Sequence, residues 1–247
     1  MVRLKACRCS CRVVNASVSR AQRPRWASLP MKTLLISLTR TAKRSPVVRS
    51  VWNHYRLALW KARGSNPNIP APDLVKHDIV RTFAAAAGTP VLVETGTYFG
   101  EMVKACLSTF SSIYSIELDG HLAAAAEKRF AGLPNVLLFE GDSARLLGPI
   151  IEDISEKCLF WLDAHYSGGF TAGLSQSQPV LAELSAVLNH KRSDHVILID
   201  DARCFDGANG YPTVDELRIL LEQSHKPYLL SIRNDIIRIY SNRLSPP

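Results

Sequence analysis

The chain has 247 residues, and its formal net charge of +8 is unevenly distributed. Residues 1–64 hold 15 of the 30 Lys and Arg residues and none of the 22 acidic residues, which leaves residues 65–247 with a net charge of −7. The length suits one large hydrophobic core, the acidic body argues against nucleic-acid binding, and no apolar run approaches the roughly 20 residues of a membrane-spanning helix.

The first 72 residues differ in composition from the rest of the chain. Residues 1–30 are basic and lack clear periodicity, which predicts a disordered tail or a targeting segment, unless Met31 is the true start. Residues 31–72 predict a basic helical arm followed by a linker. Within the arm, apolar residues at helical spacing predict an amphipathic helix over residues 47–63, which either contacts an acidic membrane surface or packs on the body.

The six cysteines indicate neither a zinc site nor a disulfide framework. Three of them alternate with other residues within the basic segment 1–30, a spacing too close for tetrahedral zinc ligands, and three are scattered through the body. They are Cys7, Cys9, Cys11, Cys106, Cys158 and Cys204. We therefore expect a reducing compartment, the cytoplasm.

Residues 73–247 alternate between helix-like and strand-like patterns. The first helix is predicted to start at Asp73 and to end at Gly88. Strands are predicted at Val91–Glu94, Ser112–Glu117, Asn135–Phe139, Leu159–Asp163 and His195–Asp200, with helices near 100–110, 121–131, 143–155 and 176–190. At the C-terminus, Tyr228–Arg233 and Ile236–Tyr240 flank an Asn-Asp pair typical of a hairpin. We expect an α/β domain with a mostly parallel seven-stranded sheet, a C-terminal antiparallel hairpin and helices on both faces.

A glycine-containing turn follows the first predicted strand. Val91 to Glu94 form a short apolar run that ends in an acid, and Gly96 and Gly100 follow before a helical pattern resumes. Such a strand–turn–helix leaves free backbone N–H groups at the start of the helix and lets a ligand approach the bare backbone. Glu94 lies at the carboxyl end of its strand, where open α/β sheets bind ligands.

Acidic residues close every one of the five predicted body strands. They are Glu94, Glu117, Glu140 with Asp142, Asp163, and Asp200 with Asp201. Parallel strands bring their carboxyl ends to one edge, about 4.8 Å apart, and crowded like charges cost free energy unless a ligand or cation offsets them. The pattern therefore predicts a binding site at this edge. Glu117 is positioned to accept hydrogen bonds from a ribose diol, and Asp142 from an exocyclic amine.

These residues carry a resemblance to a known family. The stretch from Glu94 to Gly100, then Glu117, the run Gly141-Asp142-Ser143, Asp163, and the run Ile199-Asp200-Asp201 resemble the class I S-adenosylmethionine-dependent methyltransferases in order and spacing. The terminal hairpin also resembles that Rossmann-like fold, and the resemblance covers about residues 73–241. It implies a cofactor site in which Glu94, Gly96, Thr97 and Gly100 hold the methionine part. Glu117 would bind the ribose hydroxyls, and Asp142 with Ser143 would contact the adenine.

The turn departs from the common motif at one position. Tyr98 stands where the family usually has a further glycine, so we expect a differently shaped turn. The variant with bulky residues there resembles the macrocin O-methyltransferase type of sugar-modifying enzymes.

A metal site is predicted from three carboxylates on two adjacent strand ends. Asp163, Asp200 and Asp201 offer the oxygen ligands that Mg²⁺ and Ca²⁺ prefer. They resemble the ligand set of the catechol and macrocin O-methyltransferases, where the metal orients neighbouring substrate oxygens. His165 is the candidate general base, beside Asp163 as the second predicted catalytic residue. The lysine that the catechol enzymes carry shortly after this Asp has no counterpart nearby.

The hypothesis from the sequence is transfer of a methyl group from S-adenosylmethionine to a hydroxyl, with Mg²⁺ assistance. The expected acceptor is a sugar, a glycoconjugate or another small molecule. The protein itself is a candidate homo-oligomer. One alternative is a non-catalytic Rossmann-like binding protein that docks through its basic N-terminal helix. The other is an NAD(P)-dependent oxidoreductase, although the turn lacks the G-x-G-x-x-G fingerprint of that class.

Overall fold

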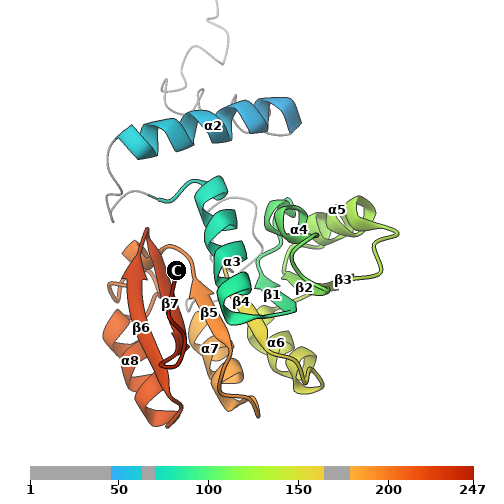
Figure 1. Cartoon of the computed structure of the whole chain (residues 1–247). Coiled ribbons are helices and arrows are strands. Elements are labelled where there is room, and N and C mark those ends of the chain that lie inside the picture. Colours follow the sequence, from blue (N-terminus) through green and yellow to red (C-terminus); the bar gives the residue numbers. More distant parts are fainter. Residues whose placement is uncertain (1–45, 63–69, 164–178) are drawn as a thin grey trace, which may run out of the picture. The chain divides into compact units, whose positions relative to one another are not determined.

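The computed structural model describes residues 46–62, 70–163 and 179–247, and Ser50–Pro247 form one compact unit. In the described part of this unit, seven strands form one sheet in the order β3-β2-β1-β4-β5-β7-β6 (Figure 1). The strands are β1 Val91–Thr95, β2 Ser112–Glu117, β3 Val136–Glu140, β4 Cys158–Leu162, β5 Val196–Ile199, β6 Tyr228–Arg233 and β7 Ile236–Ser241. Each lies within about one residue of its predicted range.

The register brings the carboxyl ends of the central strands together. β1 pairs in parallel with β2 and β4, and Thr95 at its end is the partner of both Ile116 and Leu162. β7 runs antiparallel to β5, with Ile197 opposite Ile239, and antiparallel to β6. The predicted parallel sheet with a terminal antiparallel hairpin is therefore confirmed.

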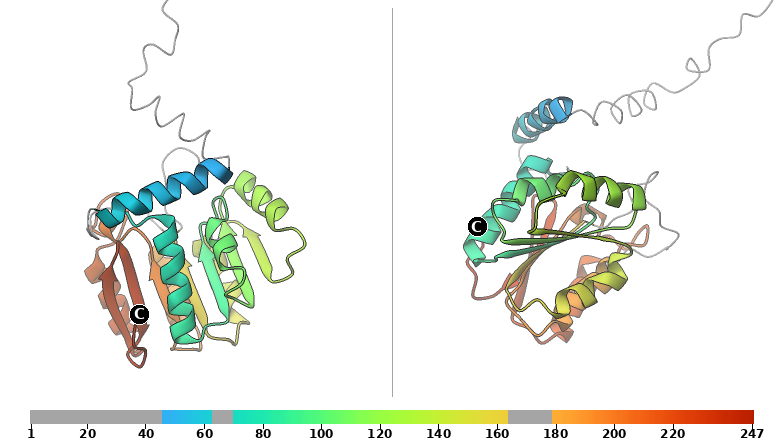
Figure 2. Two further views of the ribbon diagram at one scale, coloured as in Figure 1. Left: turned by 45° about the horizontal axis from the view of Figure 1, so that its top comes forward. Right: turned by 90° about the vertical axis from the view of Figure 1, so that its right-hand side faces the viewer.

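Helices cover both faces of the sheet (Figure 2). One face packs against α3 Asp73–Ala87, α4 Glu101–Cys106 and α5 Gly120–Phe130, and the other against α6 Ser143–Glu152, α7 Val180–Asn189 and α8 Val214–Gln223. Because both faces are covered, every residue of β1 and β4 is buried, which explains their continuous apolar sequence. The predicted start and end of α3 are confirmed, and Gly88 caps it in the left-handed conformation.

The sequence analysis missed α8, although its start carries a local signal. The hydroxyl of Thr213 accepts from the backbone N–H of Glu216, while the carboxylate of Glu216 accepts from the backbone N–H of Thr213. This reciprocal pair is the capping box, and its Thr-x-x-Glu pattern precedes an apolar run in the sequence. A short 3-10 helix, η2 Ala202–Cys204, follows β5.

The predicted basic helix is present as α2 Pro46–Ala62. Its described side chains include exposed apolar groups, among them Val51 and Tyr55. No helix within the described residues is long and apolar enough to cross a membrane.

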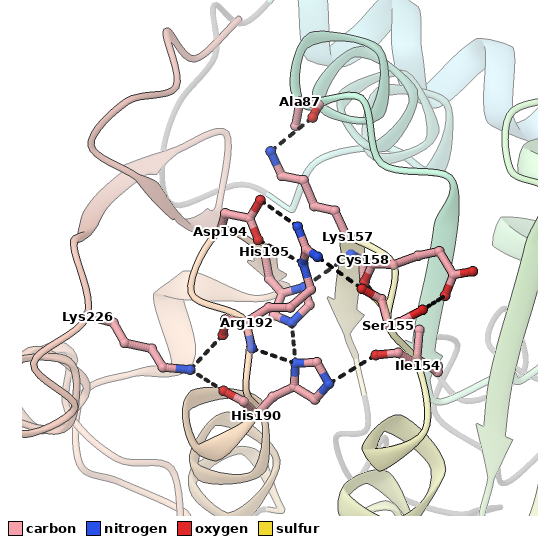
Figure 3. Close-up of polar contacts among 11 residues, drawn as sticks. Ala87, Ile154, Ser155, Lys157, Cys158, His190, Arg192, Asp194, His195 and Lys226 are labelled. Carbon is pink, nitrogen blue, oxygen red and sulfur yellow. Dashed lines mark hydrogen bonds and ion pairs between the residues drawn. The ribbon is translucent and has the colours of Figure 1, made fainter.

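The amino ends of β4 and β5 meet at a pair of buried histidines (Figure 3). His195 accepts from the backbone N–H of Cys158 through Nδ1 at 3.1 Å, so its Nε2 carries the hydrogen and donates to Nδ1 of His190 at 2.8 Å. His190 in turn donates through Nε2 to the carbonyl of Ile154 at 3.1 Å. The backbone donor at Cys158 thus holds both rings neutral, each with its hydrogen on Nε2.

Candidate functional site

The turn between β1 and α4 takes its shape from three residues in the left-handed region. Gly96, Tyr98 and Gly100 have φ values of 83°, 49° and 68°. At Gly100 a Cβ atom would lie 2.6 Å from the ring of Phe130, so this position needs glycine for space as well as for φ. Tyr98 adopts the backbone conformation that a glycine would take, so the tyrosine is accommodated by strain at this residue.

A chain of buried hydroxyls connects the turn to Glu94. The hydroxyls of Thr97 and Ser115 lie 2.6 Å apart, and that of Ser115 donates to Glu94 Oε2 at 2.6 Å. Glu94 is 2% exposed. Burial raises the pKa of Glu94 to about 8, although the hydrogen bond from Ser115 opposes the rise. The base of the turn is therefore a fixed polar network.

Glu117 holds the turn from the next strand. Its Oε2 accepts from the backbone N–H of Tyr98 at 2.6 Å, and its Oε1 accepts from the backbone N–H of Asp119 at 3.0 Å. The residue is 5% exposed. A carboxylate accepts about four hydrogen bonds, so each oxygen keeps capacity for a ligand hydroxyl. Two backbone amides thus fix a carboxylate beside the glycine turn.

Asp142 and Ser143 lie at the turn from β3 into α6. Asp142 caps this helix, because its Oδ1 accepts from the backbone N–H of Ala144 at 3.0 Å. Gly141 donates to the carbonyl of Glu117 at 2.8 Å, which brings the turn beside the end of β2. Ser143 is buried. The two residues are therefore neighbours of Glu117 at one sheet edge, and Asp142 also has a structural role.

The three carboxylates predicted as metal ligands lie at the ends of β4 and β5. The backbone N–H of Asp163 donates to Thr95 O and that of Asp200 to Leu162 O, both at 3.1 Å, so each residue continues its strand by one position. Asp201 follows in the left-handed conformation with φ of 56°. The topology therefore brings these carboxylates to adjacent strand ends.

Basic side chains contact two of the three carboxylates. Lys76 of α3 forms an ion pair with Asp200 Oδ2, and Arg203 binds Asp201 Oδ1 at 2.7 Å and also pairs with Asp235. Burial lowers the pKa of Lys76, but the carboxylates of Asp200 and Asp163 outweigh this effect and hold the pKa above its ordinary value. Over residues 46–62, 70–163 and 179–247, no group of three His, Cys, Asp or Glu residues is arranged to hold a metal ion.

The site also contains residues that the sequence analysis did not single out. Lys76 is one of them. The sequence feature that could have indicated it is a basic residue in the first turn of a helix, where the helix dipole disfavours a cation. Ser115 and Glu183 are others. Glu183 is buried in the first turn of α7, and burial raises its pKa to about 7, an effect that Ser143 opposes. The predicted base His165 lies outside the described residues.

The strand order, with its antiparallel seventh strand, defines the Rossmann-like class I methyltransferase fold. No family model and no curated protein matches the sequence. Among solved structures, a protein assigned as a caffeoyl-CoA O-methyltransferase from Staphylococcus aureus is 13% identical with a TM-score of 0.51, over 78% of this chain and 100% of that one. This likeness shows the fold.

Two further solved structures match with lower TM-scores. An O-methyltransferase from Bacillus cereus is 15% identical with a TM-score of 0.49, over 83% of this chain and 97% of that one. The Podospora anserina methyltransferase PaMTH1 is 16% identical with a TM-score of 0.49, over 87% of this chain and 98% of that one.

Proposed function

We propose that this protein is an S-adenosylmethionine-dependent methyltransferase that acts on a hydroxyl group. The observation that carries the proposal is Glu117, a buried carboxylate fixed by two backbone amides beside the glycine turn of a class I methyltransferase fold. A nucleoside offers a ribose diol with two adjacent donors, which suits such a carboxylate.

The residues around Glu117 suit the remaining parts of the cofactor. The turn from Gly96 to Gly100 offers bare backbone for the methionine part, and Glu94 with Thr97 forms its polar base. Asp142 and Ser143 would lie toward the adenine. Bound there, S-adenosylmethionine supplies the methyl group, and the protein contributes orientation and removal of water.

The acceptor site would lie over the carboxyl ends of β4 and β5. Asp163 and Asp200 present carboxylates to a polar acceptor, which favours a hydroxylated substrate such as a sugar or a glycoconjugate. His165 remains the candidate for the group that takes the hydroxyl proton, and Asp163 precedes it by two residues in the sequence.

Magnesium assistance stays a prediction. The acids at Asp163, Asp200 and Asp201 are suitable ligands by type, but Lys76 and Arg203 already contact two of them, which does not fit a simple metal cage. Retention of methyl transfer in EDTA would contradict the magnesium hypothesis.

Other parts of the hypothesis concern location and partners. A cytoplasmic location and a homo-oligomer remain expectations. The exposed apolar and basic side chains of α2 support a proposal of peripheral contact with an acidic membrane surface. A binding protein that lacks catalysis would use the same helix, and an NAD(P)-dependent oxidoreductase would use the same fold.

Calorimetric titration with S-adenosylmethionine tests the proposed function, with NAD⁺ and NADP⁺ as comparison ligands. We expect saturable binding of S-adenosylmethionine alone, because the turn lacks the G-x-G-x-x-G fingerprint of the dinucleotide-binding proteins, with Tyr98 at the position of its second glycine. Binding of a nicotinamide dinucleotide instead would favour the oxidoreductase, and binding of none of them would contradict both proposals.

Replacement of Tyr98 tests the strain in the turn. At φ of 49°, glycine avoids the clash of a Cβ atom, so we expect Tyr98→Gly to be more stable than Tyr98→Ala by about 1 kcal/mol. Both variants lose the ring that packs on Phe99, so the comparison isolates the backbone. Denaturant unfolding measures the difference. As a control, Glu127→Gly at an exposed position within α5 should be less stable than Glu127→Ala, because glycine weakens a helix.

A further inference from the structure

Lys76 reaches from α3 across to the end of β5. Its ammonium group forms an ion pair with Asp200 Oδ2, although the two residues are 124 positions apart in the sequence. The side chain of Lys76 is 15% exposed, and that of Asp200 is 1% exposed. The pair is thus held inside the protein at the edge where the acidic residues gather.

The other oxygen of Asp200 is left for a ligand. Asp200 Oδ1 is buried, and no residue in the described part of the chain forms a hydrogen bond with it. A buried carboxylate oxygen without a partner costs about 1–3 kcal/mol, and more when it is charged. A hydroxyl donor that enters the site would satisfy it.

The local charge balance explains why a lysine is placed here. Asp163, Asp200 and Asp201 sit on adjacent strand ends, where their mutual repulsion needs a cation. Lys76 and Arg203 together supply two positive charges, the same number that one divalent ion would supply. A divalent ion that entered this cluster would have to displace the ammonium from Asp200 and would be repelled by it.

We propose that Lys76 is a built-in cation of the candidate active site, taking the position at Asp200 that a divalent metal would otherwise occupy. Its ammonium group orients the Asp200 carboxylate so that Oδ1 faces an acceptor hydroxyl. Lys76 is a positioning residue in this arrangement. Its part in placing the acceptor rests on the proposed function, whereas its exclusion of a divalent ion does not.

Metal binding by single variants tests this inference without cofactor or acceptor. Mn²⁺, which is paramagnetic, serves as the probe, and electron paramagnetic resonance measures free ion during titration of the full chain. We expect no saturable binding by the wild-type protein at the acidic cluster. The Lys76→Met variant should bind Mn²⁺ at least about tenfold more tightly than the wild-type protein, because removal of one of the two cations makes the cluster of three carboxylates more negative and frees Asp200 Oδ2.

Matched variants assign that binding to the cluster. The double variant Lys76→Met with Asp200→Asn should lose it, Lys76→Arg should retain the wild-type behaviour, and Lys104→Met, at an exposed lysine of α4, should also match the wild type. Lys76→Gln replaces the methionine variant if the latter does not fold. The proposal would be overturned if the wild-type protein bound Mn²⁺ and the Asp200→Asn substitution removed that binding. It would also be overturned if a folded Lys76→Met or Lys76→Gln variant gained no affinity for Mn²⁺.

The Mn²⁺ titration and the S-adenosylmethionine titration together separate this inference from the proposed function. Failure of S-adenosylmethionine to bind would remove the acceptor-positioning role of Lys76 but would leave the Mn²⁺ results unchanged. Conversely, tight Mn²⁺ binding by the wild-type protein that Asp200→Asn removes would refute the built-in cation and leave the cofactor site intact.

Discussion

The Glu117→Ala variant is expected to bind S-adenosylmethionine at least about a hundredfold more weakly than the wild-type chain. Hydrogen bonds to a charged group contribute about 1.5–3 kcal/mol each, and a ribose diol offers two of them. The substitution also releases the backbone N–H groups of Tyr98 and Asp119, which the carboxylate now holds. Calorimetric titration measures the change in affinity.

Two further variants separate the cofactor contact from loss of structure. Glu117→Gln retains one acceptor oxygen and should lose less affinity than the alanine variant. Glu222→Ala, at an exposed acid in α8, should bind like the wild type. Wild-type affinity in a folded Glu117→Ala protein would show that this carboxylate does not bind the ribose.

Acidification should destabilise the protein through the buried histidine pair. Burial and, to a lesser degree, the neighbouring His190 lower the pKa of His195 to about 3, whereas an unfolded histidine has a pKa near 6.5. The unfolded chain therefore binds the proton first. The stabilising contribution is complete above pH 6.5 and is lost as the pH falls toward 3, by about 1.4 kcal/mol per pH unit. Between pH 6.5 and 4.5 the loss is about 2–3 kcal/mol from this group.

Denaturant unfolding at several pH values measures this loss. The His195→Gln variant lacks the titrating ring, so its free energy of unfolding should decline less over the same range by about that amount. His121→Gln, at an exposed position of α5, should follow the wild-type profile. Parallel profiles for the wild-type and His195→Gln proteins would contradict the assignment of neutral, hydrogen-bonded rings (Figure 3).

The histidine pair and the acidic edge lie at opposite ends of the same strands. Cys158 begins β4 and meets His195, while Asp163 follows the other end of β4. Substitutions at the histidines should therefore change the free energy of unfolding without directly altering the candidate site.

Most of the fold follows from local patterns in the sequence. Apolar strand runs, helical spacing and a left-handed glycine at the end of α3 depend on neighbours within a few residues, so the elements were predicted within narrow limits. Alternating strands and helices imply parallel strands, and parallel strands have their carboxyl ends at the same edge of the sheet. This is why the acids Glu94, Glu117, Asp163 and Asp200 were correctly grouped there. The exception is α8, whose capping box was present but overlooked.

The sequence by itself thus determined the α/β architecture, the glycine turn and the acidic edge, because each depends on local periodicity or strand direction. Only the tertiary structure decided which cation meets those acids. Lys76 faces Asp200 because α3 packs over β4 and β5, and no local pattern specifies a contact between residues so distant in the chain. The same is true of Ser115 beneath Glu94 and of His190 against His195, since side-chain pairing across separate elements is set by packing.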